Sequence, residues 1–270
     1  MSKVLNVGIA GFGTIGKVIG KALDGGISGL KLVAVTSGSA DKASQNMKHF
    51  NNRVPVVNAD ELINKADIIV ECAPTSAFMS VAEPSLLQGK VLVTVSGAAI
   101  LQNPDIVETA KKHNGKIVLA TGALLGLDAV RAAAKGTIYS VKMVTRKPPT
   151  SLTKAKYVIE NEIDLSNLTQ PLRLFKGSAR EGAEQFPSNV NVAAALGLAG
   201  IGADETQLEI WADPTKERNT HNIKVDACSA NFELTIENVP TIENPGTGRI
   251  TALSVLAALE SLSTPLRVGS

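Results

Sequence analysis

The chain has 270 residues, 44% of them hydrophobic and 19% charged, which suits a globular protein with a full apolar core in one large domain or two modest ones. A net charge of +2 without a basic tract, together with only 3% aromatic residues, argues against nucleic acid or an anionic membrane as a partner. Cys72 and Cys228 are too few for a disulfide framework or a metal cluster, and they fit a reducing cytoplasm. Because residues 1–3 lead straight into the first expected strand, we expect no signal peptide, and the most apolar run, 190–201, is too short to span a bilayer.

The opening stretch, residues 4–26, predicts a strand, a glycine-rich loop and a helix. An apolar run covers 4–10, a helical pattern covers 17–23, and the loop between them is Gly11, Phe12, Gly13, Thr14, Ile15 and Gly16. In Gly-x-Gly-x-x-Gly the first glycine permits a tight turn, the second lets a pyrophosphate approach the backbone, and the third lets the helix pack on the strand. Free N–H groups at the helix start would face the phosphates. The six loop residues are therefore expected to contact a dinucleotide; the alternative is a glycine-rich turn in another kind of α/β protein.

The choice of dinucleotide is expected to depend on the residues that follow the second strand, 30–35. About 20 residues past the glycines, an NAD site usually has an Asp or Glu that binds the ribose hydroxyls. This chain has Thr36 and Ser37 there, followed by Lys42, and hydroxyls with a cation can accept the 2′-phosphate of NADP. The sequence favours NADP, with NAD also usable, although Asp41 could bind the ribose and Lys42 could be a solvated loop charge.

Strands and helices alternate through the first half, which predicts an α/β fold with a doubly wound parallel sheet. Expected strands cover 54–57, 67–73, 91–95 and 116–120, and expected helices cover 59–66 and 104–113. Ligands bind at the carboxyl ends of the strands in such a sheet. The residues expected beside the nicotinamide half of the cofactor are therefore Ala73, Pro74, 96–97 and 121–123.

Cys72 lies at the end of one of these strands, where a catalytic thiol could act through a thioester. Its surroundings in Ile-Ile-Val-Glu-Cys-Ala instead favour a small buried core residue. We do not expect a cysteine nucleophile.

The period of the sequence changes after residue 135. Alternating apolar and polar residues, typical of half-buried strands, cover 138–146, 207–212, 222–227 and 231–236. Short connections favour a mostly antiparallel sheet in an α+β domain, open to solvent or to a partner on one face. An alanine-rich helix, 192–199, is expected to have Asn189 or Asn191 as its N-cap.

The change of period predicts two domains. Residues 1–125 are expected to form a Rossmann domain that binds NAD(P), and residues 126–247 a domain for substrate binding and dimerisation. The apolar last helix, 250–262, belongs to a segment, 248–270, that is expected to pack back on the first domain.

Five stretches together resemble the L-aspartate dehydrogenase family. They are 120–123 with 126–129, Thr-Arg-Lys-Pro-Pro at 145–149, Phe-Pro-Ser-Asn-Val-Asn-Val-Ala-Ala at 186–194, Ala-Asp-Pro at 212–214 with Asn-Thr-His-Asn at 219–222, and Glu-Asn-Pro-Gly-Thr-Gly at 243–248. The resemblance spans nearly the whole chain. It implies oxidation of L-aspartate to iminosuccinate with reduction of NAD(P), the product feeding NAD synthesis or releasing oxaloacetate and ammonia. We expect a cytoplasmic homodimer.

The resemblance also carries residue roles. It implies that His221 is catalytic and that Ala123, with Asn189 or Asn191, contacts the cofactor. Some members of the family have a lysine where this chain has Gly246. If that lysine binds a substrate carboxylate, another cation must do so here.

Histidine suits the chemistry that the resemblance implies. Hydride loss from the α-carbon of an amino acid requires a neutral amine, so a base must first take a proton. His49 lies in an expected polar loop and His113 at the end of an expected helix, where its charge is favourable. His221 is expected in the polar loop 218–222, where the residues alone favour a solvated side chain and the resemblance favours a base. A dicarboxylate substrate also requires cations, for which the candidates are Arg146, Lys147, Arg218 and Arg249.

Two other functions remain open. One is a cyclic-imine reductase resembling dihydrodipicolinate reductase, which shares this general architecture. The other is a non-catalytic NAD(P)-sensing protein whose second domain serves only as an interface. His221 among asparagines favours an enzyme, because a sensor needs no proton acceptor beside the nicotinamide.

Overall fold

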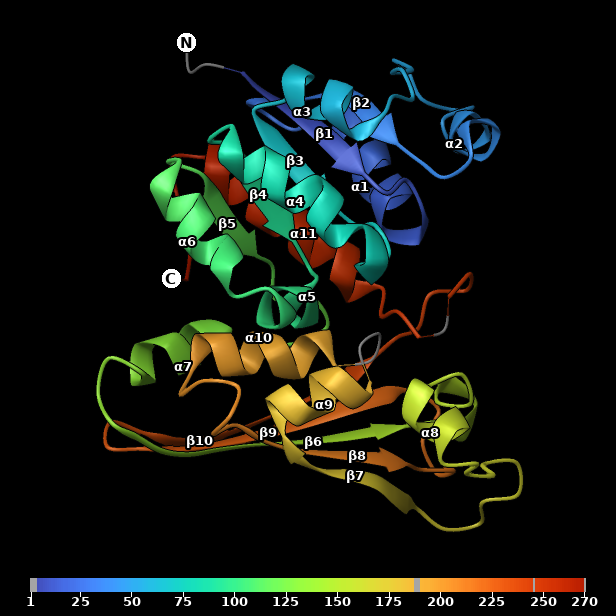
Figure 1. The fold of residues 1–270 in the computed structure, drawn as a ribbon, viewed down its shortest axis with the longest axis vertical. Coiled ribbons are helices and arrows are strands. Elements are labelled where there is room, and N and C mark those ends of the chain that lie inside the picture. Colours follow the sequence, from blue (N-terminus) through green and yellow to red (C-terminus); the bar gives the residue numbers. More distant parts are fainter. Residues whose placement is uncertain (1–3, 187–189, 245, 270) are drawn as a thin grey trace. The chain divides into compact units, whose positions relative to one another are not determined.

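The computed structural model describes residues 4–186, 190–244 and 246–269, and these fall into two compact units (Figure 1). The first unit comprises Met1–Ala120 with Thr251–Val268, and the second comprises Thr121–Ile250 with Gly269–Ser270. Each unit is built on its own five-stranded sheet.

The sheet of the first unit is parallel, with strand order β2-β1-β3-β4-β5, as the alternating pattern predicts. Its strands are β1 (Leu5–Ala10), β2 (Leu30–Thr36), β3 (Ile68–Glu71), β4 (Val91–Thr94) and β5 (Lys116–Leu119). Its helices are α1 (Thr14–Gly25), α2 (Ala40–Asn46), α3 (Ala59–Lys65), α4 (Phe78–Leu87), α5 (Gly97–Gln102), α6 (Asp105–Lys112) and α11 (Ile250–Ser263), with a 3₁₀ turn at Thr75–Ala77. The chain order reverses between β1 and β3, which is where such sheets bind ligands.

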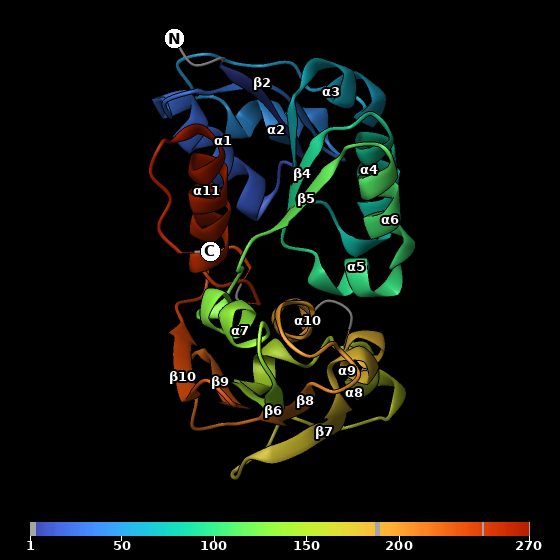
Figure 2. The same ribbon diagram turned by 90° about the vertical axis from the view of Figure 1, so that its left-hand side faces the viewer.

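Both faces of this sheet are covered by helices (Figure 2). On one face α1 and α11 pack through Ile19, Leu23, Val255 and Leu259 against β1 and β2. On the other face α3, α4 and α6 contribute a second apolar core that includes Phe78. Burial on both faces explains why the strands of this half are almost continuously apolar.

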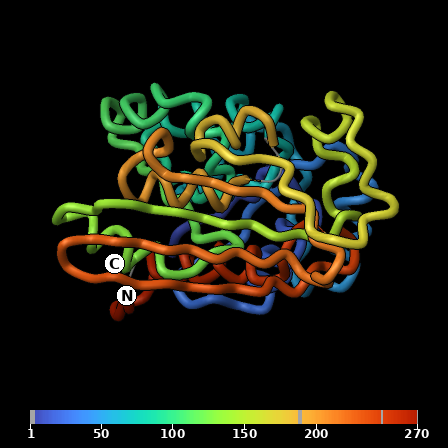
Figure 3. Tube along the Cα trace, turned by 90° about the horizontal axis from the view of Figure 1, so that it is seen from below, coloured from blue at the N-terminus to red at the C-terminus, as the bar shows by residue number. Residues whose placement is uncertain are grey.

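The sheet of the second unit is mixed, with strand order β10-β9-β6-β8-β7 (Figure 3). Its strands are β6 (Ile138–Lys147), β7 (Leu172–Ser178), β8 (Gln207–Ala212), β9 (Asn219–Ala227) and β10 (Asn231–Asn238). Its helices are α7 (Leu127–Ala133), α8 (Lys156–Glu160), α9 (Ala179–Gln185) and α10 (Asn191–Ala199), with a 3₁₀ turn at Pro149–Ser151. Within this unit the helices lie on one side of the sheet (Figure 1).

The two faces of this second sheet differ in polarity, because neighbouring residues of a strand point to opposite sides. Along β6, Val141, Met143 and Thr145 are buried, whereas Lys142 and Arg146 alternate with them and are partly exposed. We call the first set the inner face and the second the outer face. The outer face is rich in charged side chains, as expected for a sheet covered on one side only.

The second sheet is mostly antiparallel, as expected, although strand β8 pairs in parallel with β6. Two expectations about local structure are wrong. Val56 makes only an isolated bridge with Val35, so 54–57 is not a strand of the sheet. Helix α10 has Val190 as its N-cap without a side-chain hydrogen bond, so Asn191 is the first helical residue and not the cap. Asn189 lies outside the described residues.

Candidate active site

The glycine loop of the first unit fits a dinucleotide phosphate. Gly13 precedes the 12-residue helix α1, and no side chain caps that helix end. A Cβ atom placed on Gly13 would meet nothing within 4 Å, so the backbone there is open to a ligand. Gly11, by contrast, has φ +93°, and a Cβ atom would come within 2.6 Å of the backbone of Cys72 and Ala73. The first glycine therefore lets the loops after β1 and β3 touch, and the second leaves room for the phosphates at a positive helix end.

The helix after this loop begins three residues earlier than the expected 17–23, at Thr14. Thr14, Ile15 and Gly16 consequently form its first turn, where backbone N–H groups have no partner within the helix. Phe12 is buried and packs edge-on against Phe50, with ring centroids 6.1 Å apart. Its side chain belongs to the core, so only its backbone can face a cofactor.

Thr36 and Ser37 follow β2 as expected, but their hydroxyl groups differ in what they contact. The Thr36 hydroxyl and carbonyl oxygens both accept from the N–H of Gly11 at 3.2 Å, which holds the glycine loop in place. The Ser37 hydroxyl accepts from the N–H of Ser39 at 3.3 Å. Lys42 is exposed in the first turn of α2. The Thr36 hydroxyl is therefore used to hold the glycine loop, whereas the Ser37 hydroxyl contacts the backbone of its own turn.

A buried carboxyl group that the sequence analysis missed organises the ends of β3 and β4. Glu71 is fully buried and accepts hydrogen bonds from the Ala73 N–H at 2.8 Å and the Thr94 hydroxyl at 2.6 Å. Burial raises the pKa of Glu71, while the hydrogen bonds from Thr94, Ser96 and Ala73 lower it. An acidic residue inside an apolar strand was the signal in the sequence that could have revealed it.

Pro74 immediately follows this network and precedes the 3₁₀ turn at Thr75–Ala77. Cys72 is partly buried, and burial, with the charge of Glu71 as a smaller cause, raises the pKa of its thiol well above the ordinary value. A thiol held in its neutral form suits a core residue and not a nucleophile.

In the second unit, His221 lies in strand β9 and not in a polar loop, which corrects the expected 218–222 loop. It sits on the inner face, paired in register with Thr145 of β6 and Ile236 of β10, and only 3% of its surface is exposed. The Thr145 hydroxyl lies 3.1 Å from His221 Nδ1. A strand therefore holds the imidazole in one orientation, with a hydroxyl partner on one ring nitrogen.

The electrostatic surroundings keep this histidine neutral. Burial, with the positive charge of Lys147 as a smaller cause, lowers the pKa of His221 to about 3. Lys147 is the last residue of β6, is 4% exposed, and has its own pKa lowered by burial to about 8. At neutral pH the pair is a neutral imidazole close to a buried ammonium.

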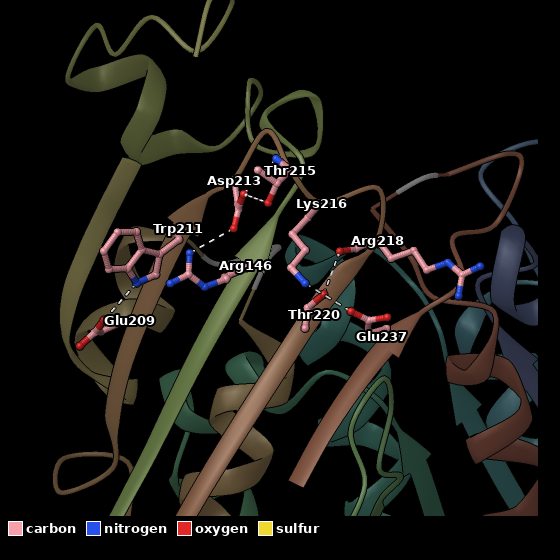
Figure 4. Close-up of polar contacts among 9 residues, drawn as sticks. All are labelled: Arg146, Glu209, Trp211, Asp213, Thr215, Lys216, Arg218, Thr220 and Glu237. Atoms are coloured by element: carbon pink, nitrogen blue, oxygen red, sulfur yellow. Dashed lines mark hydrogen bonds and ion pairs between the residues drawn. The ribbon is translucent and has the colours of Figure 1, made fainter. Parts of the chain in front are cut away.

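The other candidate cations are placed differently. Arg146 points to the outer face, where it lies over the Trp211 ring at 4.7 Å and pairs with Asp213 at 3.1 Å (Figure 4). Arg218 is exposed, and its side chain extends away from the contacts drawn around it (Figure 4). Arg249 is exposed and donates from Nε to the carbonyl of Pro240 at 3.2 Å. Of these four, Lys147 alone is buried on the face that carries His221.

The remaining residues carried over from the resemblance are only partly described. The carbonyl of Ala123 accepts a hydrogen bond from Asn238 Nδ2 at 3.0 Å, which ties this loop to the end of β10. Asn191 opens α10. The N–H of Gly246 donates to Asn244 Oδ1 at 3.2 Å, and a glycine has no side chain that could supply a cation.

A doubly wound unit with this glycine loop, followed by a mixed unit with a buried neutral histidine, defines a nicotinamide-dependent oxidoreductase of two domains. Two protein families match the chain. The family described as "Homoserine dehydrogenase, NAD binding domain" matches residues 11–120, and the family described as "Aspartate dehydrogenase, C-terminal" matches residues 128–262.

The relatives narrow this class. An L-aspartate dehydrogenase of Bradyrhizobium diazoefficiens is 49% identical over 100% of this chain and 95% of its own length, and L-aspartate dehydrogenase 3 of Bordetella bronchiseptica is 48% identical over 98% of each. The crystal structure of aspartate dehydrogenase from Thermotoga maritima shares the fold with a TM-score of 0.75 at 24% identity, covering 98% of this chain and 99% of that one. The chain belongs to the aspartate dehydrogenase family, as its motifs predict.

Two properties of the described residues bear on partners. None of their helices combines the length and apolar character needed to cross a membrane. They also contain no group of three or more His, Cys, Asp or Glu side chains arranged to hold a metal ion.

Proposed function

We propose that the protein oxidises L-aspartate to iminosuccinate with reduction of NAD(P)⁺, and that the imine then hydrolyses to oxaloacetate and ammonia. The observation that carries this proposal is His221, a buried neutral base fixed on β9 in a chain 49% identical to an L-aspartate dehydrogenase along its whole length. The reverse reaction, reductive amination, uses the same groups.

The first unit would bind the dinucleotide, which supplies a hydride acceptor when bound. Residues 11–16 would hold the pyrophosphate through the backbone at the start of α1. Ala73 and Pro74 would border the nicotinamide half, in a loop that Glu71 orders through the Ala73 N–H. By analogy with the family, we propose Ala123 and either Asn189 or Asn191 as further contacts of the cofactor.

The second unit would supply the proton acceptor. We assign the ring proton of His221 to Nδ1, which then donates to the Thr145 hydroxyl and leaves the lone pair on Nε2. Nε2 takes a proton from the substrate ammonium, so that the amine nitrogen can form the C=N bond as hydride leaves the α-carbon. Thr145 fixes the ring orientation and is a positioning residue.

For the cofactor, we propose that NADP binds at least as well as NAD. Position 37 carries a hydroxyl where a carboxylate would repel a 2′-phosphate, and Lys42 lies in the next helical turn. We also infer that the protein is a cytoplasmic homodimer. Light scattering of the purified protein tests the dimeric state.

A spectrophotometric screen of amino and hydroxy acids at alkaline pH, with NAD and NADP, tests the function. We expect L-aspartate to give the highest kcat/KM, because a missing carboxylate leaves site cations unpaired. Equal rates with L-alanine or L-glutamate would contradict the substrate. Cofactor binding without oxidation of any substrate would instead support an NAD(P)-sensing protein.

A further inference from the structure

Glu71 lies in the last paired row of the parallel sheet, at the point where the chain order of the strands reverses. In that row Ala10 of β1, Glu71 of β3 and Thr94 of β4 are in register. The glycine loop begins with the residue after Ala10, and the Cys72 N–H donates to the Ala10 carbonyl at 2.8 Å. Doubly wound sheets bind their ligands at this point, beyond the carboxyl ends of the strands. The row therefore brings a carboxyl group to the edge of the sheet where a dinucleotide binds.

The carboxyl group of Glu71 is surrounded by hydrogen-bond donors. Its Oε1 accepts from the Ala73 N–H at 2.8 Å, and its Oε2 accepts from the Thr94 hydroxyl at 2.6 Å. The Thr94 oxygen in turn accepts from the Ser96 N–H at 2.9 Å, which leaves the hydroxyl hydrogen for Glu71. The Ser96 side chain is a further hydrogen-bond partner of the carboxyl group. These donors suit the ionised form, because a protonated carboxyl group would itself have to donate.

The carboxylate of Glu71 has donors around it but no cation. Glu71 is fully buried, and burial raises its pKa because the charge is poorly solvated, while the hydrogen bonds lower it. Among the described residues, the groups that interact with it are hydroxyls, a backbone N–H and the Cys72 thiol, none of which is positively charged. A buried carboxylate in this setting gains free energy when an opposite charge comes close. The oxidised nicotinamide ring carries such a charge, whereas the reduced ring is neutral.

We propose that the Glu71 carboxylate distinguishes the two redox forms of the cofactor. It attracts the positively charged nicotinamide ring of NAD(P)⁺ and not the neutral ring of NAD(P)H, so it favours binding of the form that accepts a hydride. This inference rests on the proposed function, which places the nicotinamide half beside Ala73 and Pro74. Because Glu71 is fully buried, it acts through its charge and not through contact with the ring. It is a residue that determines specificity for the redox form and not a catalytic one.

A charge effect of Glu71 can be separated from its structural effect on the loops that follow β3 and β4. Loss of loop order would weaken both redox forms by the same factor, because the two forms share their adenosine, pyrophosphate and ribose groups. Loss of the negative charge would weaken the oxidised form alone. The Kd of NADP⁺ divided by the Kd of NADPH therefore reports the charge, and a structural role would leave this ratio unchanged.

Equilibrium binding at alkaline pH measures this ratio without turnover. NADPH is titrated through its fluorescence, and NADP⁺ through its displacement of bound NADPH; NAD⁺ and NADH are compared in the same way. We expect Glu71→Gln to raise the ratio of the two Kd values about tenfold over the wild type. For a two-electron couple, this change makes the reduction potential of the bound cofactor about 30 mV more positive.

Two further variants serve as controls. Glu71→Asp keeps the charge on a shorter side chain, so the ratio should stay within about twofold of the wild type even where both affinities fall. Glu83→Gln removes a carboxylate from an exposed position of α4, where water and salt screen it, and should leave the ratio unchanged. Thermal unfolding shows whether each variant is folded. If Glu71→Gln does not fold, Glu71→Ala removes the same charge and should raise the ratio in the same direction.

Equal weakening of NADP⁺ and NADPH in a folded Glu71→Gln variant would overturn the proposal and leave Glu71 with a structural role only. A ratio that rises as much in Glu71→Asp as in Glu71→Gln would also overturn it, because the aspartate retains the charge. Failure of the wild type to oxidise L-aspartate would contradict the proposed function without altering the binding ratio, so the two failures are distinguishable.

Discussion

The two sheets of this protein prepare a site in different ways. In the first unit both faces of the sheet are apolar and covered, and the features that suit a ligand are backbone features: an open glycine, an uncapped helix end and a loop held by hydrogen bonds. In the second unit the groups that suit chemistry are side chains of the strands themselves, His221, Thr145 and Lys147, on the inner face of the sheet.

This difference has a physical reason. A dinucleotide phosphate is bound well by N–H groups at a helix start, which require only a loop without side chains in the way. Proton transfer and charge recognition require particular side chains in fixed orientations, and a strand inside a sheet holds them more rigidly than a loop. Substitutions in the glycine loop should consequently affect binding of the dinucleotide, and substitutions of the side chains on the inner face of the second sheet should affect the chemistry.

The largest effect is expected from His221→Ala. General acid–base catalysis contributes about 10²–10⁴-fold, so kcat should fall by that order while dinucleotide affinity stays within a few-fold of the wild type. Steady-state kinetics and fluorescence titration with NADPH measure the two quantities. His113→Ala, at the end of α6, is the control and should keep its kcat.

Near-normal kcat in His221→Ala would remove the residue from the chemistry. Loss of dinucleotide binding in the same variant would show that His221 is not confined to the chemical step.

The second effect concerns stability and comes from the buried ammonium. Because the pKa of Lys147 is about 8 in the folded protein and about 10.5 in the unfolded chain, the unfolded state binds more protons between these values. The free energy of unfolding should therefore rise with pH across this window, by about 3 kcal/mol from this group. Chemical denaturation of the wild type and Lys147→Met at pH 7 and pH 10 measures it.

Lys147→Met should be the more stable protein at pH 7, and its advantage should shrink toward pH 10. An advantage that does not depend on pH would contradict the lowered pKa of Lys147.

The third effect tests the backbone site of the first unit. Since a Cβ atom on Gly13 meets nothing within 4 Å, Gly13→Ala should unfold like the wild type but clash with a bound pyrophosphate. We expect dinucleotide affinity to fall about 10–100-fold. Gly25→Ala, near the other end of α1 and equally open, is the matched control. Equal affinities in both variants would place the phosphates elsewhere.

Sequence patterns predicted the first unit better than the second, for reasons visible in particular residues. The strand, glycine loop and helix at the start are local features, and alternation of strands with helices already implies a parallel sheet. The parallel pairing of β6 with β8 joins segments about 65 residues apart and has no local signal. Strand β7 was missed because a bulge between Arg173 and Phe175 interrupts its alternation.

The sequence did not predict the geometry in which the structure places the candidate site residues. His221 was expected in a loop because Asn219, Thr220, His221 and Asn222 are all polar, whereas a strand usually alternates. If His221 acts as we propose, the inner face is polar at that point because it carries the site, and the alternation of polar and apolar residues fails there for that reason. Strand parity could have placed Lys147, and not Arg146, on the inner face with Val141 and Met143, had the expected strand been extended by one residue.

The fourth effect is smaller and concerns Glu71, the side chain that orders backbone loops in the first unit. Glu71→Gln keeps the size but offers an NH₂ group where the Ala73 N–H and the Thr94 hydroxyl now donate, so one hydrogen bond must be lost or turned. We expect a loss of about 1–2 kcal/mol in the free energy of unfolding and a raised KM for the dinucleotide with little change in kcat. Glu83→Gln, exposed on α4, is the control. A changed kcat with an unchanged KM would move Glu71 from the cofactor side to the chemistry.

The smallest effect is expected at Ser37, where a side chain in the first unit would read the cofactor. Ser37→Asp places a carboxylate where a 2′-phosphate would lie and where the ribose hydroxyls of NAD would find an acceptor. Repulsion between two partly solvated anions amounts to about 1–2 kcal/mol, so the ratio of kcat/KM for NADP over NAD should fall about tenfold. Ser44→Asp adds the same charge to an exposed position of α2 and should leave the ratio unchanged. Because the Thr36 hydroxyl is engaged with the Gly11 N–H, Thr36→Val should weaken both cofactors alike. A wild type that strongly prefers NAD, with a ratio that Ser37→Asp does not alter, would show that this hydroxyl does not contact the ribose.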